Sequence, residues 1–179
     1  MAFKGKEPIR TKIIIENKCI EQVSHFTYLG CDITYDYDDD MVKKLHNFQR
    51  ICGTLSRTLR RRTRKETQIK LYKVMATPTL LYGSETWTLN TRDLSRIQAA
   101  EMRYLRSVKG CTLLDRIRND DIRRELKIFN LCDRIREYRN CWQDHVQRMT
   151  DARLPKAAFN YRPKGRRDRG RPRKRWLEQ

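Results

Sequence analysis

The stretch "ITYDYDDDMVKK", residues 33–44, decides how the first part of this chain folds. Within it, Tyr37-Asp38-Asp39-Asp40 matches the Y-x-D-D pattern, in which adjacent carboxylates hold the divalent ions of nucleotide transfer. A site of that kind needs its aspartates at the tip of a β-hairpin, between two apolar strands. The residues before it suit a strand, because Cys31, Ile33 and Tyr35 alternate with polar residues. The residues after it therefore settle the question.

Those later residues predict a helix and not a second strand. Apolar side chains recur at spacings of three and four over more than five turns. They are Met41, Leu45, Phe48, Cys52, Leu55 and Leu59. We therefore expect Asp38, Asp39 and Asp40 at a helix N-terminus, where carboxylates accept free backbone N–H groups and oppose the positive dipole end, each for about 0.3–1 kcal/mol. A third carboxylate for two-metal chemistry has no candidate upstream. We interpret the match as helix capping and assign no catalytic residue or metal ligand.

Charge points to a polyanionic partner. The 179 residues include 41 Lys and Arg against 22 Asp and Glu, a net charge of +19, and only 38% are hydrophobic. Self-repulsion of this size destabilises a compact chain unless a polyanion neutralises it. Nucleic acid is the expected partner. An acidic membrane surface is the alternative, but no apolar stretch approaches transmembrane length. The opening residues "MAFKGKEPIRTK" lack the apolar core of a signal peptide.

The six cysteines contain no C-x-x-C pair, so we expect reduced intracellular thiols, and we interpret those in the pattern that follows as small core residues. The nearest approach to a metal pattern is Cys132, Cys141 and His145. These three fall within one predicted helix and lack a fourth ligand nearby, so zinc is the weaker interpretation. No cofactor is assigned.

The first 35 residues predict short strands. The runs "KIII" (12–15) and "KCIEQV" (18–23) flank Glu16-Asn17, and Asn can supply the positive φ of a tight turn. The segment "HFTYLGCDIT" (25–34) is expected as a third short strand. Gly30 interrupts its alternation, where a bulge or a close backbone approach would fit.

Residues 39–149 predict helices throughout. A second helix is expected to start at Thr63, with Glu66 completing a capping box, and Pro78 is expected to kink or end it. Its expected buried face comprises Ile69, Tyr72, Val74 and Met75. The block from Tyr82 to Trp87 places Ser next to Glu without a nearby histidine, which is no hydrolase arrangement. We expect a turn there, with Trp87 anchoring the seam between helices.

A third helix is expected from Asn90 or Thr91 to Gly110. Its inward side chains would be Leu94, Ile97, Leu105 and Val108. A short helix around residues 120–126 leads to a last long one. One face of this last helix is expected to hold Leu131, Ile135, Tyr138, Trp142, His145 and Met149. We interpret Trp142 and His145 as core residues and not as ligands.

Two basic regions are candidates for nucleic-acid contact. The first has only Glu66 opposing eight cations, a net charge of +7. Its cations are Arg57, Arg60, Arg61, Arg62, Arg64, Lys65, Lys70 and Lys73. A helical surface of nearly one sign suits a phosphate backbone; a solvated charged face is the alternative. The second region, residues 151–179, has eleven basic and three acidic residues, with three prolines and two glycines. We expect it to be disordered in the free protein.

The second region contains Arg169-Gly170-Arg171-Pro172, the core of an AT-hook. Gly lets the backbone lie on the minor-groove floor, Pro keeps the chain extended, and arginines enter the narrow groove of A·T-rich DNA. The candidate contact residues are Arg166, Arg167, Arg169, Gly170, Arg171, Pro172, Arg173 and Lys174. A sequence-blind polybasic arm or a nuclear-import signal is the alternative, and nuclear localisation is compatible with each.

Four segments together resemble a known family. They are "FTYLG" (26–30), "KLYKVMATPTLLYGSETWTL" (70–89), "HVQRM" (145–149) and "GRPRKRW" (170–176). In this order they resemble the C-terminal part of the endonuclease–reverse transcriptases of LINE-type (non-LTR) retrotransposons. The resemblance spans about residue 13 to 177. No single motif is decisive, but their combination is specific.

The resemblance implies a role without catalysis. In that family Y-x-D-D precedes the Phe-x-Tyr-Leu-Gly strand, which looks like the primer grip and corresponds to Phe26, Tyr28, Leu29 and Gly30. The helices after it correspond to the thumb and the region beyond. The chain would then begin after the catalytic aspartates, without palm or endonuclease. It would bind a primer–template hybrid or duplex DNA, with no cofactor of its own, since Mg²⁺ belongs to the parent enzyme.

We therefore expect a mainly α fold. Residues 1–37 would form the β-hairpin and primer-grip-like segment, 38–150 a bundle-like helical thumb, and 151–179 a basic tail. A free-standing nuclear DNA-binding protein with an AT-hook-like tail, domesticated from a retroelement, is the alternative. A metal-dependent phosphoryl-transfer enzyme that uses Asp38 to Asp40 ranks last.

Overall fold

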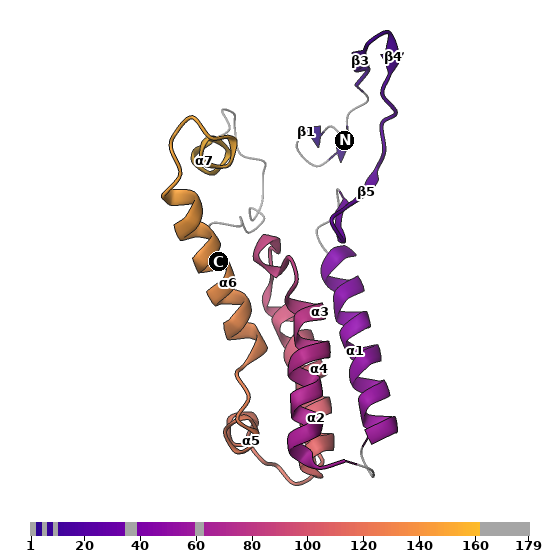
Figure 1. Cartoon of the computed structure of the whole chain (residues 1–179), viewed down its shortest axis with the longest axis vertical. Coiled ribbons are helices and arrows are strands. Elements are labelled where there is room, and N and C mark those ends of the chain that lie inside the picture. Colours follow the sequence, from indigo (N-terminus) through magenta and orange to yellow (C-terminus); the bar gives the residue numbers. More distant parts are fainter. Residues whose placement is uncertain (1–2, 5–6, 9–10, 35–38, 60–62, 162–179) are drawn as a thin grey trace. The chain divides into compact units, whose positions relative to one another are not determined.

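The computed structural model describes residues 3–4, 7–8, 11–34, 39–59 and 63–161. The chain divides into two units, residues 1–44 and 45–179. The first unit holds short strands and the start of one helix, and the second is helical (Figure 1). The predicted fold class, mainly α with small hairpins at the N-terminus, is therefore confirmed.

The strands form three antiparallel hairpins. Their strands are β1 (Phe3–Lys4) with β2 (Glu7–Pro8), β3 (Ile14–Ile15) with β4 (Lys18–Cys19), and β5 (His25–Tyr28) with β6 (Cys31–Thr34). Between β3 and β4, Glu16 and Asn17 have φ values of 51° and 61°. Two consecutive positive φ angles are those of a type I′ turn, whose twist matches its strands. The predicted turn at these two residues is confirmed.

The segment predicted as one third strand is a complete hairpin. Leu29 and Gly30 have φ values of 48° and 76°, so Gly30 lies in a two-residue turn and not in a bulge. The register pairs Phe26 with Ile33 and Tyr28 with Cys31. The alternating residues Phe26, Tyr28, Cys31 and Ile33 therefore share one face of the two paired strands. On this face the Phe26 and Tyr28 rings stack, with centroids 6.3 Å apart.

The opening acidic stretch leads into helix α1 (Asp39–Leu59), as predicted. The buried carboxylate of Asp40 accepts a hydrogen bond from the backbone N–H of Asp32 at 3.0 Å. Its second oxygen accepts one from Lys44 Nζ at 2.8 Å. Asp40 therefore ties the helix start to strand β6. Asp38 and the side chain of Asp39 lie outside the described residues.

A second attachment joins this hairpin to α1. The carboxylate of Asp32 accepts hydrogen bonds from Lys43 Nζ at 2.6 Å and from Thr27 Oγ1 at 2.8 Å. The Lys43 hydrogen bond, followed by that of Thr27, lowers the pKa of Asp32. The Asp32 side chain is only 4% exposed, so the ion pair is partly shielded from solvent.

The helix after Thr63 differs from the prediction at its start. Helix α2 (Lys65–Leu71) has Arg64 at its N-cap, without a side-chain cap. Thr63 Oγ1 instead donates to the Leu59 carbonyl at 3.1 Å. The predicted Thr63–Glu66 capping box is wrong because Thr63 satisfies the last turn of the preceding helix.

Helix α2 continues through a π-helix, η1 (Tyr72–Ala76), into α3 (Thr77–Leu81). Pro78 therefore does not end the helix, since it lies in the first turn of α3 after a segment with wider hydrogen-bond spacing. Val74 and Met75, predicted to be buried, are 65% and 47% exposed. The same segment buries Ala76 and Leu80 instead.

The block after α3 forms the predicted seam. Gly83 takes a φ of 70° before the short 3₁₀ helix η2 (Ser84–Thr86). Trp87 is 5% exposed, and its carbonyl accepts a hydrogen bond from Arg139 Nη2 at 2.5 Å. Because Arg139 belongs to α6 (Leu131–Gln147), this bond joins the turn to the last long helix. The anchoring role of Trp87 is confirmed.

Helix α4 (Thr91–Lys109) follows the sequence closely. The Asn90 carbonyl oxygen accepts from the Asp93 N–H at 3.0 Å, and the Asp93 carboxylate accepts from the Asn90 N–H at 3.2 Å, which is a reciprocal capping box. Gly110 closes the helix with a φ of 86°. Of the four predicted inward residues, Ile97, Leu105 and Val108 are buried and Leu94 is half-buried.

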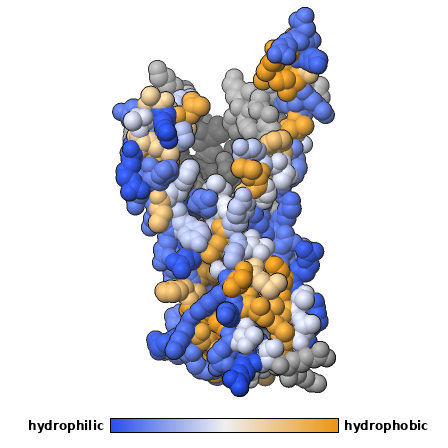
Figure 2. Space-filling model, viewed as in Figure 1, coloured by the Kyte–Doolittle hydropathy of each residue, from blue (hydrophilic) through white to orange (hydrophobic). Residues whose placement is uncertain are grey.

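An aromatic stack forms the centre of the helical unit. The Tyr72 ring stacks on Tyr104 at 5.1 Å and meets Phe48 edge-on at 6.0 Å. Each of these three side chains is at most 3% exposed. Figure 2 shows mainly hydrophilic residues on the visible face, with apolar residues gathered in its lower part.

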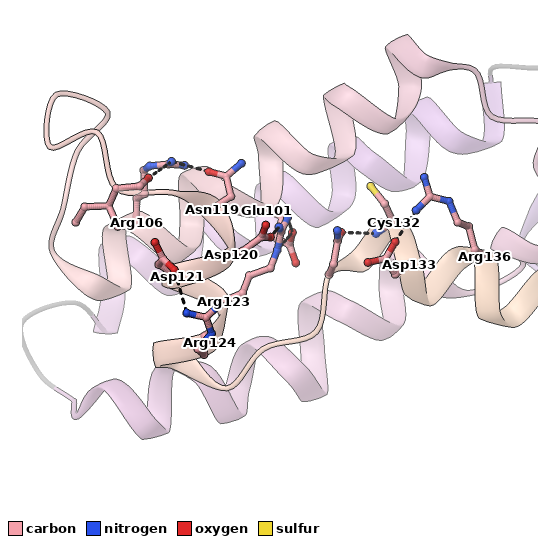
Figure 3. Close-up of polar contacts among 12 residues, drawn as sticks. Glu101, Arg106, Asn119, Asp120, Asp121, Arg123, Arg124, Cys132, Asp133 and Arg136 are labelled. Atoms are coloured by element: carbon pink, nitrogen blue, oxygen red, sulfur yellow. Dashed lines mark hydrogen bonds and ion pairs between the residues drawn. The ribbon is translucent and has the colours of Figure 1, made fainter.

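A buried ion pair joins α4 to helix α5 (Asn119–Leu126), near the predicted position of the short helix. Arg123 Nη2 and Nε donate to Glu101 Oε2 at 2.6 and 3.1 Å, and the two side chains are 5% and 0% exposed (Figure 3). Burial raises the pKa of Glu101, and the Arg123 hydrogen bond opposes that rise.

The outer face of α6 corrects another prediction. Leu131 and Ile135 are buried as expected, but Tyr138 and Trp142 are 42% and 40% exposed. His145 is exposed too, 5.6 Å from the Trp142 ring, so neither is a core residue. The face toward the protein holds Cys132, Arg139 and Val146 instead. On that face Arg139 donates to the Trp87 carbonyl, so a buried arginine stands where the sequence predicted aromatic core residues.

Cysteine placement is mixed. Cys52 and Cys132 are buried, and burial raises the pKa of Cys52 to about 12. Cys19 and Cys141 are exposed, so the interpretation as a core residue holds for Cys132 and is wrong for Cys141. All six thiols are free.

The region predicted to lack regular structure begins with a helix, α7 (Leu154–Asn160). Pro155 lies in its first turn, where the missing N–H of proline leaves no helical hydrogen bond unmade. The prediction is wrong for these residues. Residues 162–179 lie outside the described part.

Breaking the buried pair should strongly destabilise the fold. We expect Arg123→Met to lower the free energy of unfolding by about 3–5 kcal/mol, since it leaves the Glu101 carboxylate without its cation. The double variant Glu101→Leu, Arg123→Met should recover most of this loss. Urea denaturation measures both. As a control, Arg124→Met removes an exposed pair and should change stability by less than about 0.5 kcal/mol; equal losses in both single variants would contradict the assignment.

Attachment of the β5–β6 hairpin should depend on pH. A carboxyl whose pKa is lowered on folding contributes stability above its unfolded pKa of about 3.9, and this is lost as pH falls through the folded value. We expect protection of the β5–β6 amides against hydrogen exchange to fall on acidification below about pH 4, and Asp32→Asn to abolish this dependence. Asp115→Asn, which removes a lowered-pKa carboxyl in the second unit, is the control and should leave the hairpin unchanged.

Candidate nucleic-acid interface

Asp40, the member of the acidic stretch whose side chain the structure describes, is engaged in structural contacts. Asp40 is paired with Lys44 and bonded to the Asp32 N–H, so its carboxylate already has a cation and a donor. Across the described ranges, no group of three or more His, Cys, Asp and Glu side chains is arranged to hold a metal ion. Cys132, Cys141 and His145, the weaker zinc interpretation, are therefore not arranged as a metal site.

The described members of the first basic region lie around the α1–α2 connection. Arg57, in the last turn of α1, is exposed and donates to Thr54 Oγ1 at 3.4 Å. Arg64 is exposed at the α2 N-cap, and Lys70 is exposed in its last turn. Arg60, Arg61 and Arg62 lie outside the described residues.

Two predicted contact lysines also hold helix ends. Lys65 Nζ donates to the Lys109 carbonyl, in the last turn of α4, at 3.1 Å. Lys73 Nζ donates to the Lys127 carbonyl, at the C-cap of α5, at 3.0 Å. Carbonyls at helix C-termini lack intrahelical donors and carry the negative end of the dipole. These ammonium groups therefore combine exposure with a fixed position.

These bonds join two lysine side chains to the main chain of two further lysines, and we define the lysine cluster as Lys65, Lys73, Lys109 and Lys127. Lys109 forms an ion pair with Glu125 at 2.5 Å, and this hydrogen bond raises the pKa of Lys109 and lowers that of Glu125. Asp121 also lies near Lys109, so four cations and two carboxylates leave a net positive charge. Both Lys65 and Lys73 were predicted contact residues, whereas Lys109 and Lys127 were missed.

A signal for one missed residue was present. The predicted stop at Gly110 places Lys109 in the last turn of α4, beside exposed carbonyls. Lys127 gave no such signal, because it takes a left-handed φ of 52° that lysine rarely adopts.

Helices α4 and α5 hold this cluster in place. Besides the Glu101–Arg123 pair, Arg106 Nη2 donates to Asn119 Oδ1 at 2.6 Å, and Arg123 Nη1 donates to Asp120 at 3.1 Å (Figure 3). Of these bonds, those of Asn119 and Arg123 to Arg106 and Glu101 join α5 to α4, and the Arg123–Asp120 bond lies within α5. The lysines at the ends of α4 and α5 are therefore carried by two helices that contact each other directly.

The primer-grip-like residues gather at the end of the β5–β6 hairpin. Phe26, Tyr28 and Leu29 are 49%, 57% and 71% exposed, and Gly30 completes the turn. The tip presents apolar side chains on a strand pair whose other face holds the Asp32 ion pair. The predicted contact residues from Arg166 to Lys174 lie outside the described residues.

Within the described ranges, no helix combines the length and apolar character needed to cross a membrane.

Comparison with known proteins gives two relatives. The chain is 24% identical over 152 residues to an uncharacterized transposon-derived protein of Caenorhabditis elegans. This match covers 80% of the chain and 54% of that protein. The chain is 30% identical over 107 residues to a Drosophila melanogaster protein named as an RNA-directed DNA polymerase from the X-element transposon. This second match covers 59% of the chain and 12% of the relative.

No family model and no solved structure matches the chain. The chain thus spans about half the length of one relative and a small part of the other. Both matches nevertheless agree with the resemblance read from the motifs. The chain is related to retrotransposon proteins, among them an RNA-directed DNA polymerase.

Proposed function

We propose that this chain is the part of a retrotransposon reverse transcriptase that follows its catalytic centre and binds the nucleic-acid backbone. The observation that carries this proposal is the 107-residue match to a transposon RNA-directed DNA polymerase, of which the chain covers only 12%. A segment of that kind contributes binding, and the metal-held carboxylates of nucleotide transfer lie elsewhere in the longer protein, with its Mg²⁺.

The first unit would act as the primer grip. A grip needs a short rigid ribbon that presses apolar side chains and backbone against the end of a strand. The β5–β6 hairpin offers a two-residue turn at Leu29–Gly30 and the stacked rings of Phe26 and Tyr28. Its attachment to α1 through Asp32 and Asp40 supports a fixed orientation.

The second unit would act as the thumb. Phosphate contacts position a protein on a duplex without reading sequence, and they come mainly from Lys and Arg. The lysine cluster, together with Arg57, Arg64 and Lys70, supplies such groups over α2 and the ends of α4 and α5. Since Lys65 and Lys73 are held by helix-end carbonyls, less side-chain entropy is lost when they meet phosphates.

Binding should depend steeply on salt. If about eight cations meet phosphates, log K should fall against log salt with a slope near −7 on duplex DNA. Replacing Arg57 and Arg64 with Gln should make the slope less negative by about two. Fluorescence anisotropy across a salt series measures it.

The matched control replaces Arg92 and Arg148 with Gln. Both are exposed, and Arg92 lies in the first turn of α4, at the opposite end from Lys109. This control should leave the slope unchanged. A flat salt response of the wild-type chain would remove the proposed function altogether.

The tail should supply a preference for A·T-rich duplex. We expect deletion of residues 162–179 to abolish the preference for A·T-rich over G·C-rich DNA in competition binding, because the Arg-Gly-Arg-Pro core fits a narrow minor groove. The variant Gly170→Ala, Pro172→Ala keeps every charge and should lose the preference while keeping general affinity. An unaltered preference after the deletion would rule out the AT-hook.

A further inference from the structure

The helical unit contains a pocket of about 380 Å³ between the π-helix, α3 and the start of α6. Its wall includes Lys73, Thr77, Leu81, Phe129, Arg134 and Tyr138. This volume lies within the range of small-ligand sites, which are mostly apolar with a few placed polar groups. The pocket reaches the surface, because Phe129 and Tyr138 are 74% and 42% exposed.

The π-helix builds one side of this pocket. Tyr72 and Thr77, both in the wall, are five residues apart, and the Thr77 N–H bonds to the Tyr72 carbonyl. In an α-helix, residues five apart point about 140° away from each other. A π-turn closes with a bond from residue i to i+5, which brings the two onto one side.

The pocket lining includes both aromatic and cationic side chains. The Arg134 guanidinium lies over the Phe129 ring, 5.2 Å from its centroid. Lys73 stands in the same wall and belongs to the lysine cluster. The described lining contains no acidic residue. Arg134 also pairs with Glu137 on its own helix at 2.8 Å, but both side chains are about half exposed and such pairs are weak.

We propose that this pocket receives one unpaired nucleotide, its base against the apolar wall beside Phe129 and Tyr138 and its phosphate beside Lys73 and Arg134. The inference rests on the proposed function and specifies its ligand. Unpaired bases are recognised by stacking on aromatic side chains and on arginine planes. The lining holds two cations, Lys73 and Arg134, and no acidic residue, which favours an anionic ligand. An apolar protein side chain in the pocket would have no use for either cation.

The site also adjoins the proposed backbone contacts. Lys73 donates to the Lys127 carbonyl just before Ile128 and Phe129 enter the pocket wall. A nucleic-acid strand whose phosphates contact the lysine cluster would therefore place an unpaired nucleotide at the opening of the pocket.

The test compares three DNA hairpin duplexes with the full chain. The first carries one bulged 2-aminopurine nucleotide, the second an abasic bulge at that position, and the third is fully paired. We expect the duplex with the bulged base to bind about tenfold more tightly than the duplex with the abasic bulge, since one stacked base contributes about that factor or more. Stacking should also quench the 2-aminopurine fluorescence. The variant Phe129→Ala, Tyr138→Ala should reduce this ratio to near one and leave binding of the paired duplex unchanged.

The control variant Leu113→Ala, Leu114→Ala truncates two exposed apolar side chains, 77% and 90% exposed, that do not line the pocket, and should keep the ratio. Thermal melts establish folding, and Phe129→Ala alone is the second variant if the double one does not fold. A wild-type ratio near one, or an unchanged ratio in the Phe129 variants, overturns the inference. Pocket-dependent binding of N-acetyl-tryptophan amide with a ratio near one would assign the site to a protein side chain and overturn it as well.

These results separate the two proposals. If the paired duplex binds with a steep salt slope and the bulged base adds nothing, only the pocket assignment fails. If no nucleic acid binds, the proposed function fails and takes the pocket assignment with it.

Discussion

The helical unit depends on one buried ion pair. Glu101 is fully buried in α4, and a carboxylate in that position is tolerated only when a cation and donors meet it. Arg123 meets it from α5 and thereby fixes the orientation of a short helix that buries few apolar side chains. From α5 the constraint extends to the Lys127 carbonyl, which holds Lys73, and to Phe129 at the pocket. The proposed binding surface and the packing of α5 on α4 thus depend on the same contact.

Local patterns in the sequence were enough for the helices whose signals are local. The spacing from Met41 to Leu59 identified α1, and Asn90 with Gly110 identified both ends of α4. The residues after the acidic triplet follow a helical period, and a helix begins there at Asp39 as predicted. One failure was local, because Thr63 bonds backward to Leu59, four residues earlier, and does not cap the next helix. Another involves a partner far away in sequence, because Arg139, on the buried face of α6, bonds to the Trp87 carbonyl.

Part of the candidate interface could likewise be predicted, because its charges are also a local pattern in the sequence. Charge density along the chain pointed to Lys65 and Lys73, but their helix-end partners follow only from the packing of α2 against α4 and α5. The pocket gave no sequence signal, because periodicity assumes 3.6 residues per turn and the segment from Tyr72 to Ala76 departs from it. Phe129 also falls in a short connection, where no periodic rule applies.

The π-helix has an evolutionary consequence. Wider turns of this kind contain one residue more than an uninterrupted α-helix would need to cover the same rise. The turn between Tyr72 and Thr77 thus holds one residue more than an α-helical turn would. Deleting one residue there would close the same turn with an ordinary i to i+4 bond and leave α3 in its present orientation. Deleting one residue from the α-helical part, by contrast, would turn everything after it by about 100°. The π-helix is therefore the position in this helix where the loss of a residue should disturb the pocket least.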